Sequence, residues 1–135
     1  MAKFVLTNAF FSIGGTDLSD HLESATLNYE AESQDTTAMS DLTRIMAGGL
    51  KSWSMDLNFR QDFAASNVDA TLFPLVGTTA TVILRADAGS VSATNPNYTG
   101  TGLVASYNPF TNAVGETANT PVSIVSAGTL SRATS

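Results

Sequence analysis

Hydrophobic and polar residues alternate most regularly between Ser52 and Arg60. The apolar positions of this segment are Trp53, Met55, Leu57 and Phe59, and a polar residue stands on either side of each. A period of two over this length is typical of a β-strand that buries one face. We therefore predict a strand here, with these four side chains as anchors of the hydrophobic core.

Other segments have a similar strand character. Residues 25–31 alternate in the same way, with Ala25, Leu27, Tyr29 and Ala31 sharing one face. Residues 79–86 are rich in Thr, Val, Ile and Leu and are followed by a turn sequence, which favours a more central strand. Further strands are expected at residues 3–6, 10–13, 102–107, 121–125 and 129–132.

One segment departs from the strand pattern. Ser66 can cap a helix, Asp69 would lie in its first turn near the positive helix end, and Pro74 limits its length. We predict a short helix over residues 66–75 and one further helical turn near residues 18–22. The chain, residues 1–135, is expected to form a single, mainly β domain: an antiparallel sandwich or barrel with one flanking short helix.

Residues 32–49 separate two predicted strands and follow neither pattern. At about 18 residues, this segment is longer than an ordinary hairpin turn, and such long loops are usually functional or disordered. Its large apolar residues are Met39, Leu42, Ile45 and Met46. Because a solvated linker lacks such residues, we predict that the loop buries them on another subunit. Arg44, in a loop that also contains Asp35 and Asp41, is either a solvated surface charge or forms an ion pair between subunits that fixes their register.

Composition argues against several classes of function. Charged residues make up 13% of the chain, about half the usual share, and the net charge is −6. This sign is opposite to that of a surface that binds nucleic acid tightly. The sequence has no cysteine, which removes disulfides and thiolate chemistry. It has no apolar run of about 20 residues and no signal-peptide pattern, so we expect synthesis and folding inside the cell.

No motif indicates catalysis or a bound cofactor. The single histidine, His21, lacks a Gly-x-Ser-x-Gly partner motif, and the acidic residues lack the spacing of a calcium loop. The glycine pairs at 14–15 and 48–49 lie outside any phosphate-loop sequence and are expected to be turns. We expect no enzyme, metal site or cofactor. A small ligand-binding β-barrel remains an alternative, with Tyr98, Tyr107 and Phe110 as its candidate aromatic cluster.

Several stretches from Ser24 onward together resemble one family. They are residues 24–32, 35–39, 49–55, 61–65, 68–75, 92–96 and 126–130. Their layout is similar to that of the major tail tube proteins of long-tailed bacteriophages, especially the short single-domain type. None of the stretches is a catalytic signature, so the resemblance concerns the overall arrangement of strands, loop and helix.

The resemblance implies a structural virion protein, made in the host cytoplasm. Such proteins form rings, usually hexameric, that stack into a hollow tube through which DNA passes during ejection without specific binding. The implied partners are other copies of the chain, together with tape measure, terminator and distal tail proteins. Tail terminators and head–tail connector rings have related folds and remain alternatives.

The resemblance also gives the predicted loop a role. Tail tube proteins carry a long loop between two strands that reaches an adjacent subunit or ring, in the position of residues 32–49. The implied subunit-interface residues are Met39, Leu42, Arg44, Ile45 and Met46. An acidic lumen would repel DNA and let it slide, which agrees with the net charge of −6.

Overall fold

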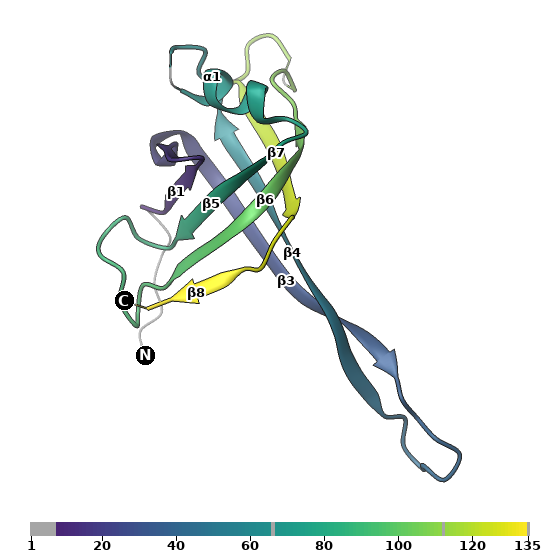
Figure 1. The fold of residues 1–135 in the computed structure, drawn as a ribbon. Helices are drawn as coiled ribbons and strands as arrows, with labels where there is room; N and C mark the ends of the chain where they lie inside the picture. The colour runs from purple at the N-terminus through teal and green to yellow at the C-terminus, as the bar shows by residue number, and fades with distance from the viewer. Residues whose placement is uncertain (1–7, 66, 112, 135) are drawn as a thin grey trace.

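The protein is a mainly antiparallel β structure with one short helix, as the sequence predicts. The computed structural model describes residues 8–65, 67–111 and 113–134. Its strands are β1 (Phe10–Ile13), β2 (Thr16–Asp17), β3 (Leu22–Asp35), β4 (Met46–Arg60), β5 (Thr79–Arg85), β6 (Asn97–Tyr107), β7 (Asn119–Ser126) and β8 (Ser131–Ala133). All belong to one sheet, in the order β2-β1-β5-β6-β7-β4-β3, with β8 beside β6 (Figure 1).

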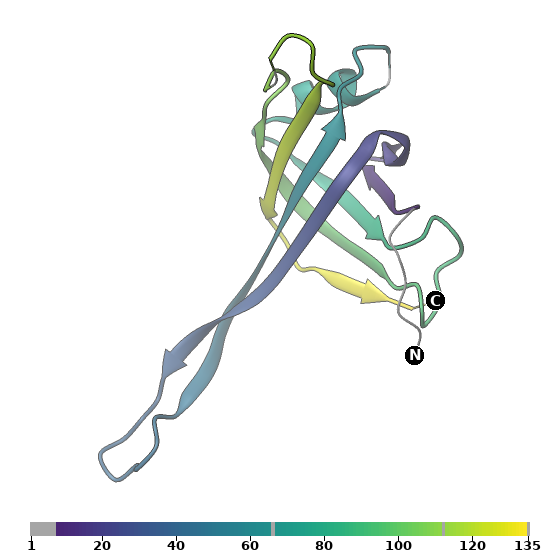
Figure 2. The same cartoon turned by 180° about the vertical axis from the view of Figure 1, so that it is seen from behind.

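The sheet curls around its core and stays open. β2 and β3 stand at the two ends of the strand order and are not paired with each other in the described sheet. Curling still brings β3 and β4 opposite β1 and β5, as both views of the ribbon show (Figures 1 and 2). Leu22, Ala25 and Leu27 of β3 pack against the same core as Phe11 of β1. The fold is therefore an open form of the predicted sandwich or barrel.

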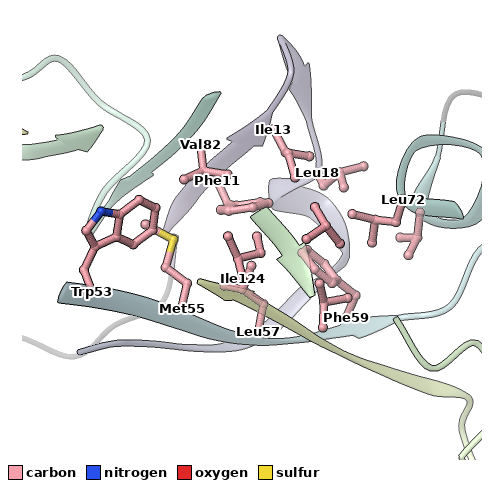
Figure 3. Packing of buried hydrophobic residues seen from close by; sticks show 13 residues of the cluster. Phe11, Ile13, Leu18, Trp53, Met55, Leu57, Phe59, Leu72, Val82 and Ile124 are labelled. Carbon is pink, nitrogen blue, oxygen red and sulfur yellow. The ribbon is translucent and has the colours of Figure 1, made fainter. Parts of the chain in front are cut away.

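The alternating residues of β4 lie at the centre of the core. Trp53, Met55, Leu57 and Phe59 are at most 4% exposed. They pack with buried residues from every layer of the fold (Figure 3): Phe11, Ile13, Leu18, Val68, Leu72, Val82, Val104, Val122 and Ile124. Burial of each such side chain contributes roughly 1.5–3 kcal/mol. The core thus joins β1, β4, β5, β6, β7 and α1.

Two glycines of β6 make room for the tryptophan. A Cβ atom on Gly100 would lie 2.7 Å from Trp53 Cζ2, and one on Gly102 would lie 2.4 Å from Ile124 Cγ2. Both distances are shorter than carbon atoms tolerate, so only glycine fits the strand beside the indole. The indole Nε1 donates a hydrogen bond of 2.9 Å to the carbonyl of Gly128, which anchors the chain before β8.

A helix occupies the predicted segment but is divided. α1 (Val68–Leu72) passes directly into a 3₁₀ turn (Phe73–Leu75), and Asn67, with extended backbone angles, is the N-cap residue. Ser66, the predicted cap, lies outside the described residues. Val68 and Leu72 are fully buried, so the helix closes one end of the core. A second 3₁₀ turn (Ser19–His21) forms where a helical turn was expected near residues 18–22.

Several predicted strand boundaries need correction. β6 and β7 each extend beyond their predicted limits, and the strand expected at 3–6 lies outside the described residues. The glycine pair Gly14 and Gly15 forms the predicted turn, with φ values of 59° and 88°, between β1 and β2. The pair Gly48 and Gly49 is not a turn but part of β4, opposite an irregularity in β3.

The loop predicted over residues 32–49 is shorter in the structure, because residues 32–35 and 46–49 belong to the paired strands of a β-hairpin. β3 continues to Asp35 and β4 begins at Met46, so the connecting loop covers only residues 36–45. The prediction fails because these strand segments have no buried face, and therefore no alternation to reveal them. The paired strands project far from the body, whereas α1 lies at the opposite end of the molecule (Figures 1 and 2).

Candidate functional site

The projecting part of the β3–β4 hairpin, here called the arm, comprises residues 29–52. β7 pairs with β4 only from Ser54 to Arg60, whereas β3 pairs with β4 as far as Asp35 and Met46. In the described sheet, the arm is consequently a two-stranded ribbon without a third strand. Such a ribbon is only marginally stable alone in water. Within the described residues, the arm therefore lacks the third strand and the core that stabilise the rest of the hairpin.

The arm exposes much of its apolar surface. Met39 and Leu42 are fully exposed in the tip loop, and Leu50 is 82% exposed on β4. Tyr29, Ile45 and Met46 are each close to half exposed. Exposed apolar residues gathered on one projecting element are typical of an interaction site, whereas single ones are unremarkable.

Polar contacts give the tip loop a defined shape. The side chain and N–H of Thr37 and the guanidinium of Arg44 interact with the Asp35 carboxylate and hold its pKa below the ordinary value. The Thr37 hydroxyl accepts a hydrogen bond of 2.7 Å from the Ile45 N–H, so it bridges the two sides of the loop. The Asp41 carboxylate accepts a bond of 2.7 Å from the Ala38 N–H. The loop therefore presents Met39 and Leu42 on an ordered turn.

The structure places the predicted interface residues together on the arm. Met39, Leu42, Arg44 and Ile45 lie in the tip loop, and Met46 is the first residue of β4. Arg44 is 74% exposed and forms an ion pair with Asp35 of its own chain, a contact that the sequence did not predict. Whether the five residues contact a neighbouring subunit stays a prediction.

The sequence did not predict the exposure of Tyr29 or the contact of Phe63 with Phe110. Tyr29 was expected on a buried face but is 52% exposed, because β3 has left the body at that point. Phe63 and Phe110 lie beside α1, 58% and 80% exposed, with their ring centroids 5.8 Å apart. They come from loops 47 residues apart in sequence, and no pattern in either loop reveals the contact.

The titratable groups near α1 have structural partners. His21 Nε2 lies 2.9 Å from Asp62 Oδ2, and the Ala64 N–H and the His21 ring hold the pKa of Asp62 below its usual value. The Tyr107 hydroxyl donates a bond of 2.7 Å to Asp69, and burial together with this bond raises the pKa of Tyr107 to about 12. These contacts tie the 3₁₀ turn, α1 and β6 to one another.

The structure does not assemble the aromatic cluster of the ligand-binding alternative. Tyr98 and Tyr107 stand at opposite ends of β6, since Tyr98 pairs with Leu84 and Tyr107 pairs with Val122. Phe110 contacts Phe63, not either tyrosine. Within residues 8–134, excluding 66 and 112, no group of three or more His, Asp or Glu side chains is arranged to hold a metal ion. The described helices are too short or too polar to cross a membrane.

Solved structures of gene transfer agent particles contain chains with this fold. One is in the virion of a native gene transfer agent particle, with a TM-score of 0.71 and 16% sequence identity over 93% of this chain and 95% of that chain. The fold is that of a gene transfer agent virion chain. A chain in the tail of an empty gene transfer agent particle, refined with helical and C6 symmetry, has a TM-score of 0.68 and 18% identity over 87% of this chain and 86% of that chain.

The likeness to gene transfer agent chains lies in the fold and hardly in the sequence. Identities of 16% and 18% accompany nearly complete coverage of both chains. No family model matches this chain, and no curated protein sequence matches it.

Proposed function

We propose that this chain is a structural component of the tail of a phage-like particle and has no enzymatic role. In this proposal its copies form rings that stack into a hollow tube, with a lumen through which DNA passes during ejection. The fold shared with a chain of a C6-symmetric tail supports this assignment and favours six copies in each ring. Cyclic rings joined by head-to-tail contacts are a common way to build such a filament.

The arm is the single observation that carries the proposal. The arm is a two-stranded ribbon that exposes Met39, Leu42 and Leu50 to water. In a monomeric binding protein nothing would stabilise such a ribbon or cover these apolar side chains. In a stack of rings, the arm reaches a neighbouring copy, which covers these side chains and supplies the contacts that the ribbon lacks. The interface residues are then Met39, Leu42, Arg44, Ile45 and Met46, with Tyr29 and Leu50 added from the structure.

Electron microscopy of the purified chain over a range of concentrations tests this function. We expect hollow rings at moderate concentration and tubes at higher concentration, followed in parallel by light scattering. Single rings that never stack would support a terminator or connector in place of a tube protein. A monodisperse monomer at every concentration would contradict the proposal.

Shortening the arm tests its part in assembly. Asp35 and Met46 are the last paired residues of the ladder, so an Asn-Gly dipeptide in place of residues 36–45 closes the hairpin with a two-residue turn. We expect a folded chain that forms no tubes. The double variant Met39→Ser, Leu42→Ser should have the same effect, whereas Ser40→Ala, in the same loop, should assemble normally. Normal tube formation by the variant with the shortened arm would show that the interface between copies does not include the tip loop.

A further inference from the structure

The end of the sheet beside α1 is acidic, whereas the opposite end holds Arg85 and Arg132 together with Asp87. β4 and β6 both end beside α1, at Arg60 and Tyr107 respectively (Figure 1). β5 ends at the opposite end of the sheet, where Arg85 pairs with Asn97 at the start of β6. The carboxylates at the α1 end are Asp20 in the 3₁₀ turn, Glu23 and Asp62 beside it, Asp69 in α1 and Glu116 in the connection from β6 to β7. Arg60 neutralises Glu23 across 3.0 Å, and His21 contacts Asp62. This end therefore has a marked excess of negative charge.

An exposed aromatic surface lies among these carboxylates. Phe63 and Phe110 contact each other there, and Phe73, directly after α1, is 69% exposed. An apolar centre with a polar, charged rim is the usual anatomy of a protein interface. This surface, made by Phe63, Phe73, Phe110 and the surrounding carboxylates, is called the α1 face below.

The opposite end presents arginines. Arg132 of β8 is exposed, and β8 pairs with the start of β6, where Asn97 lies opposite Ala133. The Arg85 guanidinium is held 4.2 Å above the Phe10 ring and donates a hydrogen bond of 3.3 Å to Asn97. Among the described residues, neither arginine forms an ion pair, and the exposed Asp87 lies two residues after Arg85. This end is called the arginine face.

We infer that the arginine face of one copy docks on the α1 face of the next copy. The inference rests on the proposed function and adds which surfaces meet between successive rings. Two different patches on one chain make a heterologous contact, which repeats without closing and yields a filament. Opposite charges on the two faces set the direction of stacking, because two α1 faces would repel each other.

The direction of the arm agrees with this polarity. The arm leaves the body away from the α1 end, so the arm and the arginine face extend toward the same neighbour (Figures 1 and 2). Charge attraction orients the two copies, and apolar contacts of Phe63 and Phe110 with the docked copy hold them together.

Charge reversal on each face tests the pairing. Arg132→Glu and Glu116→Lys each place like charges across the junction, and we expect each to raise the protein concentration needed for tube formation by about tenfold or more. The double variant Arg132→Glu, Glu116→Lys carries one reversed charge on each face and should return to within about threefold of the original concentration. Asp56→Lys changes the net charge by as much as Glu116→Lys but lies in the middle of β4, and serves as the control.

The outcomes separate this inference from the proposed function. Far-ultraviolet circular dichroism of each variant verifies folding, since both reversed side chains are exposed. If the unmodified chain forms tubes and both single variants form them at the same concentration, the inference is wrong and the function stands. Loss of tubes in both single variants without recovery in the double variant also contradicts charge pairing. Absence of rings and tubes from the unmodified chain overturns the proposed function itself.

Discussion

The inner and outer halves of the β3–β4 hairpin use the same two strands in opposite ways. In the inner half, β7 pairs with β4 and one face of the ribbon covers the core, where Met55, Leu57 and Phe59 are buried. The outer half continues the same ladder into solvent, and Leu50, Met46 and the tip residues stay exposed. Pairing alone therefore does not decide burial. A third strand and a core on one face of the ribbon separate the half that stabilises the fold from the half that we propose for assembly.

Truncation of a side chain in each half should show the largest contrast. Phe59 is fully buried against Phe11, with ring centroids 5.6 Å apart, so Phe59→Ala should lower the free energy of unfolding by about 3–5 kcal/mol. Leu42→Ala, at the tip, should change it by less than about 0.5 kcal/mol. Urea denaturation at concentrations below assembly measures both. Equal losses would mean that the tip packs against its own body in solution.

Glycine substitution sharpens the same contrast. A Cβ at Gly102 would overlap Ile124 and crowd Trp53, so Gly102→Ala should cost about 1–3 kcal/mol of unfolding free energy. Gly48, in the outer half, has open space around the position of a Cβ, and Gly48→Ala should be neutral or slightly stabilising. Thermal unfolding of the two variants in dilute solution measures the difference. A large loss from Gly48→Ala would show that the outer half is packed.

Alkaline pH should act on the body and not on the arm. Unfolded tyrosine titrates near pH 10, whereas Tyr107 in the folded body has a pKa of about 12. Below pH 10 both states keep the proton; as the pH rises from about 10 to about 12, the unfolded state loses it first, so stability falls. Tyr107→Phe should remove this part of the pH dependence. An unchanged pH profile in that variant would assign the effect to other groups.

The smallest effect is expected at the tip. The pKa of Asp35 is lowered, so its stabilising contacts with Thr37 and Arg44 are present above the usual aspartate range and are lost as the pH falls through the lowered pKa. Asp35→Asn should speed amide hydrogen exchange at Thr37 and Ile45 at neutral pH, while global stability changes by less than about 0.5 kcal/mol. A loss of unfolding free energy well above about 0.5 kcal/mol would show that the tip loop packs against the body of the protein.

The contrast between the halves also explains what the sequence could and could not predict. Burial imposes a period of two on residues 53–59, so the strand and its core face can be predicted from pattern alone. In the described part of the chain, the outer half packs on no core, and Gly48 and Gly49 interrupt its alternation of apolar and polar residues. The sequence therefore predicts a loop over residues 32–49, where residues 32–35 and 46–49 are in fact strand residues. The large apolar residues Met39 and Leu42 in a predicted loop still indicate an interaction surface, because apolar residues gathered at an exposed position are typical of one.

The contact of Phe63 with Phe110 and the different charges of the two ends depend on the topology. β4 and β6 both end beside α1, which places loops distant in sequence next to each other. The sequence shows the overall charge of −6 but not its separation along the strands.

The central claim is that other copies of the chain bury the arm, and the absence of cysteine allows a direct test. In the variant Leu42→Cys, the rate of maleimide labelling is measured in dilute monomer and in assembled tubes, with urea-unfolded chain as the reference for full exposure. We predict that the monomer reacts nearly as fast as the unfolded chain and that assembly slows the reaction at least about tenfold. Equal labelling of monomer and tubes would contradict the claim.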